Sequence, residues 1–114
     1  MQIVKTYPEE LSKKQLYELT MSPKTQKMKD AKGSVVDVAA WCIYEDEDSN
    51  GETRKVLAVL TPEGETLATN SSTFMDDFSK MCDLFGDGGV GRLEVISGTS
   101  KAGREFITCA YAGD

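Results

Sequence analysis

Apolar residues along this chain are spaced first as in strands, then as in a helix, and then again as in strands. Three stretches after Gly33 are rich in apolar and β-branched side chains, which favours strands. They are residues 34–44, 53–61 and 65–69. Between the first two, Asn50 and Gly51 predict a tight hairpin turn because both residues tolerate a positive φ.

The next segment carries a single apolar stripe at helical spacing, which predicts a helix with one buried face. The stripe consists of Phe74, Phe78, Met81, Cys82 and Phe85. Asn70, Ser71 and Ser72 precede the helix, and Gly86 is its natural stop. Two further strands are expected at 92–97 and 104–111, joined by the turn GTSKAG.

The resulting order, β-β-β-α-β-β, predicts a mainly β protein with the five-stranded barrel of the OB-fold, in which the helix plugs one end. An SH3-like barrel lacks so long an internal helix. A split α/β sandwich would need a second strongly apolar helix. We therefore expect an OB-fold domain at 34–114, with residues 1–33 as an N-terminal extension that packs on the barrel.

The N-terminal extension is predicted to be mostly helical. Residues 2–5 suit a short edge strand, and residues 9–20 suit a helix for which Ser12 is a plausible N-cap. Ser22 and Pro23 repeat the start signal for a second helical segment that ends at Gly33. Because the extension holds few apolar residues, it is expected to lie against the barrel or to become ordered on a ligand.

Length and composition indicate one soluble intracellular domain. A chain of 114 residues with 39% hydrophobic residues supports one core and no more. No apolar run approaches the roughly 20 residues that span a bilayer, and residues 1–7 lack a signal-peptide pattern. Three widely spaced cysteines, Cys42, Cys82 and Cys109, suit reduced core thiols, so a cytoplasmic location is expected.

The net charge of -6 opposes binding to nucleic acid, but the charges are unevenly distributed. Residues 1–32 hold seven basic and four acidic side chains, whereas residues 33–87 hold three basic and twelve acidic ones. A locally positive groove on an acidic body is compatible with this pattern, because the local field decides what is attracted.

Catalytic chemistry is not indicated. The chain has no histidine, no CxxC spacing and no phosphate-loop motif, so neither an enzyme nor a cofactor or metal is expected. The acidic run EDEDSNG at 45–51 is similar to a calcium loop, but Gly51 falls one position late and no glutamate closes the loop. A solvated hairpin tip, or an acidic surface for a basic protein, explains the run better.

Basic residues in three places are candidates for phosphate contacts. The turn 98–104 lies where an OB-fold has one of the two loops that flank its ligand groove. The start of the second strand is expected to flank the same face, and lysines of the extension are expected to lead a nucleic-acid backbone into the groove. The candidates are Lys24, Lys27, Lys32, Arg54, Lys55, Arg92, Lys101 and Arg104.

Aromatic residues on the strands are candidates for base stacking, which any base sequence allows. They are Trp41, Tyr44, Phe106 and Tyr111. The two-residue period of a strand places Trp41 and Tyr44 on opposite faces, so at most one of them points into the core. For Trp41, core packing and stacking are equally compatible with the sequence.

Three segments resemble the small OB-fold single-stranded-DNA-binding proteins of phages and mobile elements of Gram-positive bacteria. The segments are KMKDAKGS at 27–34, TNSSTFMDDF at 69–78 and ISGTSKAGREFITC at 96–109. The resemblance covers about residues 27–111. It implies sequence-tolerant protection of single strands in replication or recombination, with proteins of those processes as partners.

The same resemblance implies a ligand face on the second and third strands, between the loops 45–52 and 97–104. Homo-oligomers are frequent among such binders, and the sequence names no interface. One departure is the ending TCAYAGD, which lacks the long acidic tail with a terminal aromatic that many bacterial single-strand binders use to recruit partners.

Three functional hypotheses follow. The first is a non-enzymatic, sequence-tolerant single-stranded-DNA-binding protein. The second is an acidic module that inhibits or recruits a nucleic-acid enzyme by presenting carboxylates in place of phosphates, as the acidic middle of the chain suggests. The third is an OB domain for an oligosaccharide or another small ligand.

Overall fold

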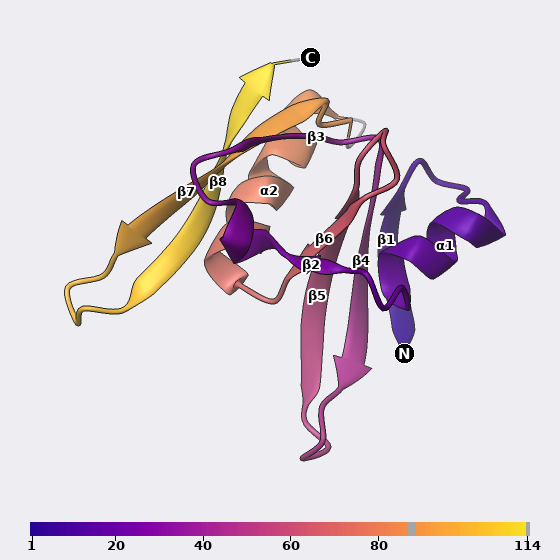
Figure 1. The fold of residues 1–114 in the computed structure, drawn as a ribbon, viewed down its shortest axis with the longest axis horizontal. Helices are drawn as coiled ribbons and strands as arrows, with labels where there is room; N and C mark the ends of the chain where they lie inside the picture. Colours follow the sequence, from indigo (N-terminus) through magenta and orange to yellow (C-terminus); the bar gives the residue numbers. More distant parts are fainter. Residues whose placement is uncertain (87–88, 114) are drawn as a thin grey trace.

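The computed structural model describes residues 1–86 and 89–113, and it places eight strands in two sheets (Figure 1). The larger sheet holds, in spatial order, β1 (Gln2–Tyr7), β4 (Ala40–Glu47), β5 (Thr53–Leu60), β6 (Thr66–Thr69) and β2 (Gln26–Lys27). The smaller sheet holds β3 (Val35–Asp37), β7 (Arg92–Thr99) and β8 (Glu105–Gly113). The helices are α1 (Lys13–Thr20), the 3₁₀ turn η1 (Met28–Ala31) and α2 (Ser72–Phe85).

The long first strand expected at 34–44 is broken into β3 and β4, which pair in different sheets. Two residues at the break bond to opposite sides: the amide of Val38 donates to the carbonyl of Gly91 (2.9 Å), and that of Ala39 donates to the carbonyl of Leu60 (2.8 Å). The chain therefore crosses from the smaller sheet to the larger one at this point. Beyond Tyr44 the strand continues to Glu47, because residues 45–47 pair with residues 53–55.

The closed five-stranded barrel predicted from the sequence is not formed by the described residues. Within them, β6 and β8 belong to different sheets, and the edge of β6 away from β5 pairs instead with β2, in parallel. The prediction of a mainly β protein is confirmed. The two sheets are separated between β6 and β8, and η1 lies beside this opening (Figure 1).

The N-terminal extension supplies both edge strands of the larger sheet, β1 and β2. Ser12 is confirmed as the N-cap of α1: its hydroxyl accepts from the Gln15 amide (3.1 Å), and the Gln15 side chain accepts from the Ser12 amide (3.0 Å). This reciprocal capping starts the helix at Lys13, later than expected.

The prediction of a second helical segment between Ser22 and Gly33 is wrong. Gln26 and Lys27 extend the sheet by pairing with Leu67 and Ala68, and the following residue, Met28, is fully buried in the core. Sheet pairing and burial of this methionine outweigh the local helix signal. Only the short turn η1 is helical in this segment.

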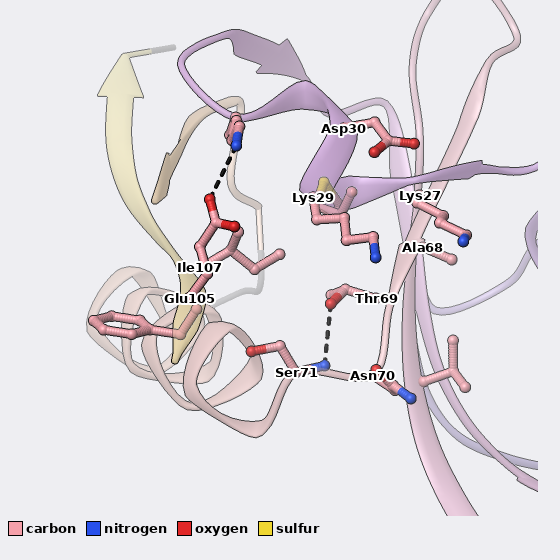
Figure 2. Close-up of a pocket in the computed structure, with 13 residues that line it drawn as sticks. Lys27, Lys29, Asp30, Ala68, Thr69, Asn70, Ser71, Glu105 and Ile107 are labelled. Atoms are coloured by element: carbon pink, nitrogen blue, oxygen red, sulfur yellow. Dashed lines mark hydrogen bonds and ion pairs between the residues drawn. The ribbon is translucent and has the colours of Figure 1, made fainter. Parts of the chain in front are cut away.

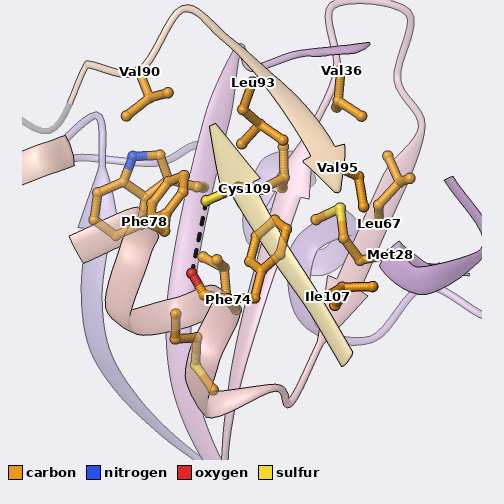
Figure 3. Packing of buried hydrophobic residues seen from close by; sticks show 14 of the residues in the cluster. Met28, Val36, Leu67, Phe74, Phe78, Val90, Leu93, Val95, Ile107 and Cys109 are labelled. Carbon is orange, nitrogen blue, oxygen red and sulfur yellow. Dashed lines mark hydrogen bonds between the residues drawn. The ribbon is translucent and has the colours of Figure 1, made fainter. Parts of the chain in front are cut away.

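The main core lies between the two sheets and α2 (Figure 3). Phe74, Phe78 and Cys82 of the predicted stripe are buried, while Phe85 at its end is partly exposed. The helix boundaries follow the local signals, because the Ser71 hydroxyl accepts from the Phe74 amide and Gly86 adopts a φ of 83°. A smaller cluster on the opposite face of β4 and β5 is covered by Leu19 of α1.

None of the helices in residues 1–86 and 89–113 is long and apolar enough to cross a membrane.

Candidate nucleic-acid interface

An open groove of about 980 Å³ lies where β2, η1, β6 and the start of β8 meet (Figure 2). Three lysines line it: Lys27, Lys29 and Lys32. The segment Thr69–Ser71, which leads from β6 into α2, lines the groove on the side opposite η1. Its apolar lining is Met28, Val56, Ala68, Phe106 and Ile107, and its two acids are Asp30 and Glu105.

Local structure fixes the positions of the lysines. Lys27 lies opposite Ala68 in the β2–β6 register. Met28, between Lys27 and Lys29, is fully buried and anchors this part of the chain, so both lysines are exposed at the groove. Across the groove, the Ser71 amide donates to the Thr69 hydroxyl (3.0 Å), which holds the connection to α2 in place.

The groove has an excess of positive charge. Lys32 pairs with Glu105 across the opening, with 2.9 Å between Nζ and Oε1. The hydrogen bond and the charge of Lys32 lower the pKa of Glu105, and the charge of Lys29 lowers it further. Within residues 1–86 and 89–113, neither Lys27 nor Lys29 forms an ion pair, so both ammonium groups are available to an anionic ligand.

The structure brings Lys27, Lys32 and Phe106 of the sequence candidates together in this groove. Lys24 is exposed in the turn that precedes β2. Lys29, a further lysine of the extension, lies between Lys27 and Lys32 in the groove lining. The signal for it was Met28, a lone large apolar residue in a polar segment, whose burial forces its two lysine neighbours outward.

The remaining basic candidates do not form one patch. The β4–β5 and β7–β8 hairpins project in different directions (Figure 1), so Lys101 and Arg104 at the second hairpin lie away from Arg54 and Lys55 on the first. Arg54 and Lys55 are consecutive strand residues and occupy opposite faces, which corrects the expectation that both flank one face. Arg54 is also paired with Asp48, at 3.1 Å between Nε and Oδ2.

Arg92 is likewise distant from the β7–β8 turn. It begins β7, at the end of the strand opposite this turn, and its Nε lies 2.8 Å from Oδ1 of Asp37. Its charge is therefore partly compensated within the smaller sheet.

Two of the four aromatic candidates are buried. Trp41 is 1% exposed and packs edge-on against Phe78, with 5.2 Å between ring centroids, so it is a core residue and not a stacking platform. Tyr44 belongs to the other core cluster, which confirms that the two side chains occupy opposite faces of β4. The expectation that at most one of them points into a core is wrong, because both are buried. The second face of β4 is covered by α1 and its flanking residues, which the strand pattern alone does not reveal.

The other two aromatic candidates reach the surface. Tyr111 contacts Phe85 at the C-terminal end of α2, with 5.0 Å between ring centroids, and does not line the groove. Phe106 is 37% exposed and lines the groove. Phe106 is therefore the aromatic residue best placed to meet a ligand.

No family model, curated protein or solved structure matches this chain. Its function is consequently inferred from the geometry and the charges of the groove.

The cysteines do not offer a reactive group. All three are buried, and burial raises the pKa of the Cys42 thiol to about 11. Burial, with smaller contributions from Asp77 and Cys82, raises the pKa of Cys109 to about 12. Both thiols stay protonated near neutral pH and are poor nucleophiles. Within the described ranges, no cluster of three or more potential metal ligands occurs.

Proposed function

We propose that this protein binds single-stranded DNA without sequence preference, with its groove lysines contacting the phosphates. The observation that carries the proposal is the groove itself, in which Lys27 and Lys29 have no ion-pair partner among the described residues. Lysine contacts to phosphate release counterions and supply the sequence-independent part of nucleic-acid affinity. Binding of this kind would protect single strands in replication or recombination.

The pairing of the strands supports an OB-type arrangement. The bent segment β3–β4 pairs through β3 with β7 and through β4 with β5, while β5 pairs with β6 and β7 pairs with β8. The OB-fold is a partly open barrel of five strands. In this arrangement the opening would lie between its third and fifth strands, β6 and β8, where the groove is found.

The ligand face that we propose differs from the one that the resemblance implied. Leu19 of α1 packs on Ala58 and Leu60, so part of the outer face of β5 is covered. Val56 and Ala68, nearer the opening, remain part of the groove. A strand would therefore pass over the β6–β8 opening. The N-terminus of α2, capped by Ser71 of the groove lining, adds a favourable dipole for phosphate.

A direct titration tests the proposal. A dye-labelled oligo-dT should bind at low salt, and the logarithm of its affinity should fall with the logarithm of salt concentration by about 0.7 per phosphate contact. Three lysine contacts predict a loss of roughly 20-fold between 50 and 200 mM salt, measured by fluorescence polarisation. Absence of binding at 50 mM salt would reject the proposal. An affinity that does not change with salt concentration would reject the phosphate contacts.

Phe106 is the proposed stacking residue. Its ring lies over Gly98 on the neighbouring strand, where an added Cβ would come within 2.6 Å of the Phe106 Cζ atom. The ring therefore packs over this glycine and stays partly exposed, in the lining of the groove. Aromatic stacking contributes about 1 to 3 kcal/mol per base.

Replacing the ring should weaken binding while the fold is kept. We expect Phe106→Leu to reduce oligo-dT affinity about tenfold, because leucine keeps much of the apolar contact and loses the stacking. Phe106→Trp should retain binding and show quenched fluorescence on adding DNA, whereas buried Trp41 should not respond. Tyr17→Leu, at an exposed ring on α1, is the matched control. Equal effects of Phe106→Leu and Tyr17→Leu would contradict the assignment.

The acidic β4–β5 hairpin supports a second candidate function, docking of a basic protein. Five carboxylates lie on or beside its turn: Glu45, Asp46, Glu47, Asp48 and Glu52. Backbone amides of Glu52 and Asn50, followed by Arg54, lower the pKa of Asp48, so this side chain is used to hold the turn. A basic nucleic-acid enzyme that binds the protein and is displaced by DNA, without direct oligonucleotide binding, would favour this alternative.

A further inference from the structure

The groove contains one carboxylate that is directly paired with a groove lysine. Glu105, the first residue of β8, pairs with Lys32, which directly follows η1, and the two residues are 73 positions apart in the sequence. Their contact bridges η1 and β8 at the opening (Figure 2). A ligand that enters the groove between these elements meets this ion pair.

The ion pair between Lys32 and Glu105 can open at little cost in stability. The side chains of Lys32 and Glu105 are 54% and 65% exposed, and an exposed ion pair contributes little to the stability of a fold. Lys32 can therefore leave Glu105 at small cost when another anion approaches. A carboxylate and a phosphate offer a lysine the same kind of charge-assisted hydrogen bond.

Glu105 acts on more than one lysine. The lowered pKa of its carboxyl reflects the hydrogen bond and charge of Lys32 and, beyond them, the charge of Lys29. The groove lining holds three lysines against Asp30 and Glu105. Among the described residues, Asp30 forms no ion pair, so Glu105 is the acid that competes directly for a lysine.

We infer that Glu105 is an internal competitor of the nucleic-acid phosphate: its carboxylate holds Lys32 in the free protein, and the pair opens when a strand binds. This inference rests on the proposed function, because it concerns regulation of the same groove. The competition weakens binding to any single phosphate and eases release of the strand. It gives a sequence-tolerant binder a means of turnover without a second ligand.

Removing the competing charge should strengthen binding. We expect Glu105→Gln to raise the affinity for oligo-dT by three- to tenfold at 50 mM salt. The slope of the salt dependence should stay near that of the wild type, because Lys32 contacts a phosphate in both complexes once the strand is bound. Asp30→Asn makes the same change of charge in the same groove without an ion pair to break, and it should raise affinity less than twofold without a change of slope.

A double-mutant cycle separates competition from a general change of charge. Lys32→Gln should cost more affinity in the Glu105→Gln background than in the wild type, because only there is Lys32 free from the start. Thermal unfolding by circular dichroism should give melting temperatures within a few degrees for all variants, since the pair is exposed.

The outcomes distinguish this inference from the function on which it rests. If the wild type binds oligo-dT with salt dependence, and Glu105→Gln binds equally or more weakly, the competition by Glu105 is rejected. The proposal that the groove binds DNA is then retained. Equal gains from Glu105→Gln and Asp30→Asn would likewise reject competition in favour of net charge. If no variant binds at low salt, both proposals fall.

Discussion

Reversing the charges of Lys27 and Lys29 to glutamate should lower the affinity for oligo-dT by about 100-fold at 50 mM salt. Each reversal removes one attraction to phosphate and adds one repulsion, each about 0.5 to 1 kcal/mol at an exposed site, which together amount to about 2 to 4 kcal/mol. Both side chains are exposed beside the groove, so the fold should tolerate the change. Fluorescence polarisation with labelled oligo-dT measures the loss.

The matched control is Lys13→Glu with Lys14→Glu at the start of α1. These two lysines are also exposed, and the variant has the same net charge as the groove variant. A loss of less than threefold is expected, because the residues lie outside the groove lining. Equal losses of affinity in the two variants would mean that the total charge governs binding. The groove would then be rejected as the interface.

Local signals made much of the fold predictable. Ser12 and Ser71 begin their helices through hydrogen bonds to adjacent residues, and Gly86 ends α2 through its backbone conformation. The hairpin at Asn50 and Gly51 formed for the same kind of reason, with Gly51 at a φ of 79°. Such features depend on a few adjacent residues, and a sequence displays them directly.

The errors arose where distant parts of the chain decide the structure. The break between β3 and β4 depends on bonds from Val38 to Gly91 and from Ala39 to Leu60, far apart in the sequence. The strand β2 has two residues and exists because β6 offers a free edge. No local pattern encodes either partner, so the sequence indicated one long strand and a helix instead.

The sequence predicted the types of residue in the candidate site better than their positions in the fold. The sequence predicts that lysines of the extension and a strand aromatic lie together, and Lys27, Lys32 and Phe106 line the same groove. Lys101 and Arg104 were expected to join Arg54 and Lys55, but the two hairpins diverge (Figure 1). The direction of a hairpin depends on the twist of its sheet, which residue spacing does not specify.

The core and the groove share residues, so the shape of the groove depends on the packing of the core. Met28 and Ile107 line the groove and belong to the main core, together with Phe74 and Phe78 of α2. Loss of packing under α2 should therefore reach the groove through Ile107 on β8. A variant of the core tests the packing under α2 independently of charge.

Phe78→Ala should reduce the free energy of unfolding by about 3 to 5 kcal/mol, because it removes a fully buried ring and leaves a cavity. Trp41 would lose its edge-on partner at 5.2 Å. Leu84→Ala, on the same helix at a side chain that is 80% exposed, is the control and should change stability by less than about 0.5 kcal/mol. Urea unfolding followed by far-ultraviolet circular dichroism measures both. A cost below about 1 kcal/mol for Phe78→Ala would be incompatible with a core that α2 closes by packing on the two sheets, because removal of a fully buried ring from such a core costs more.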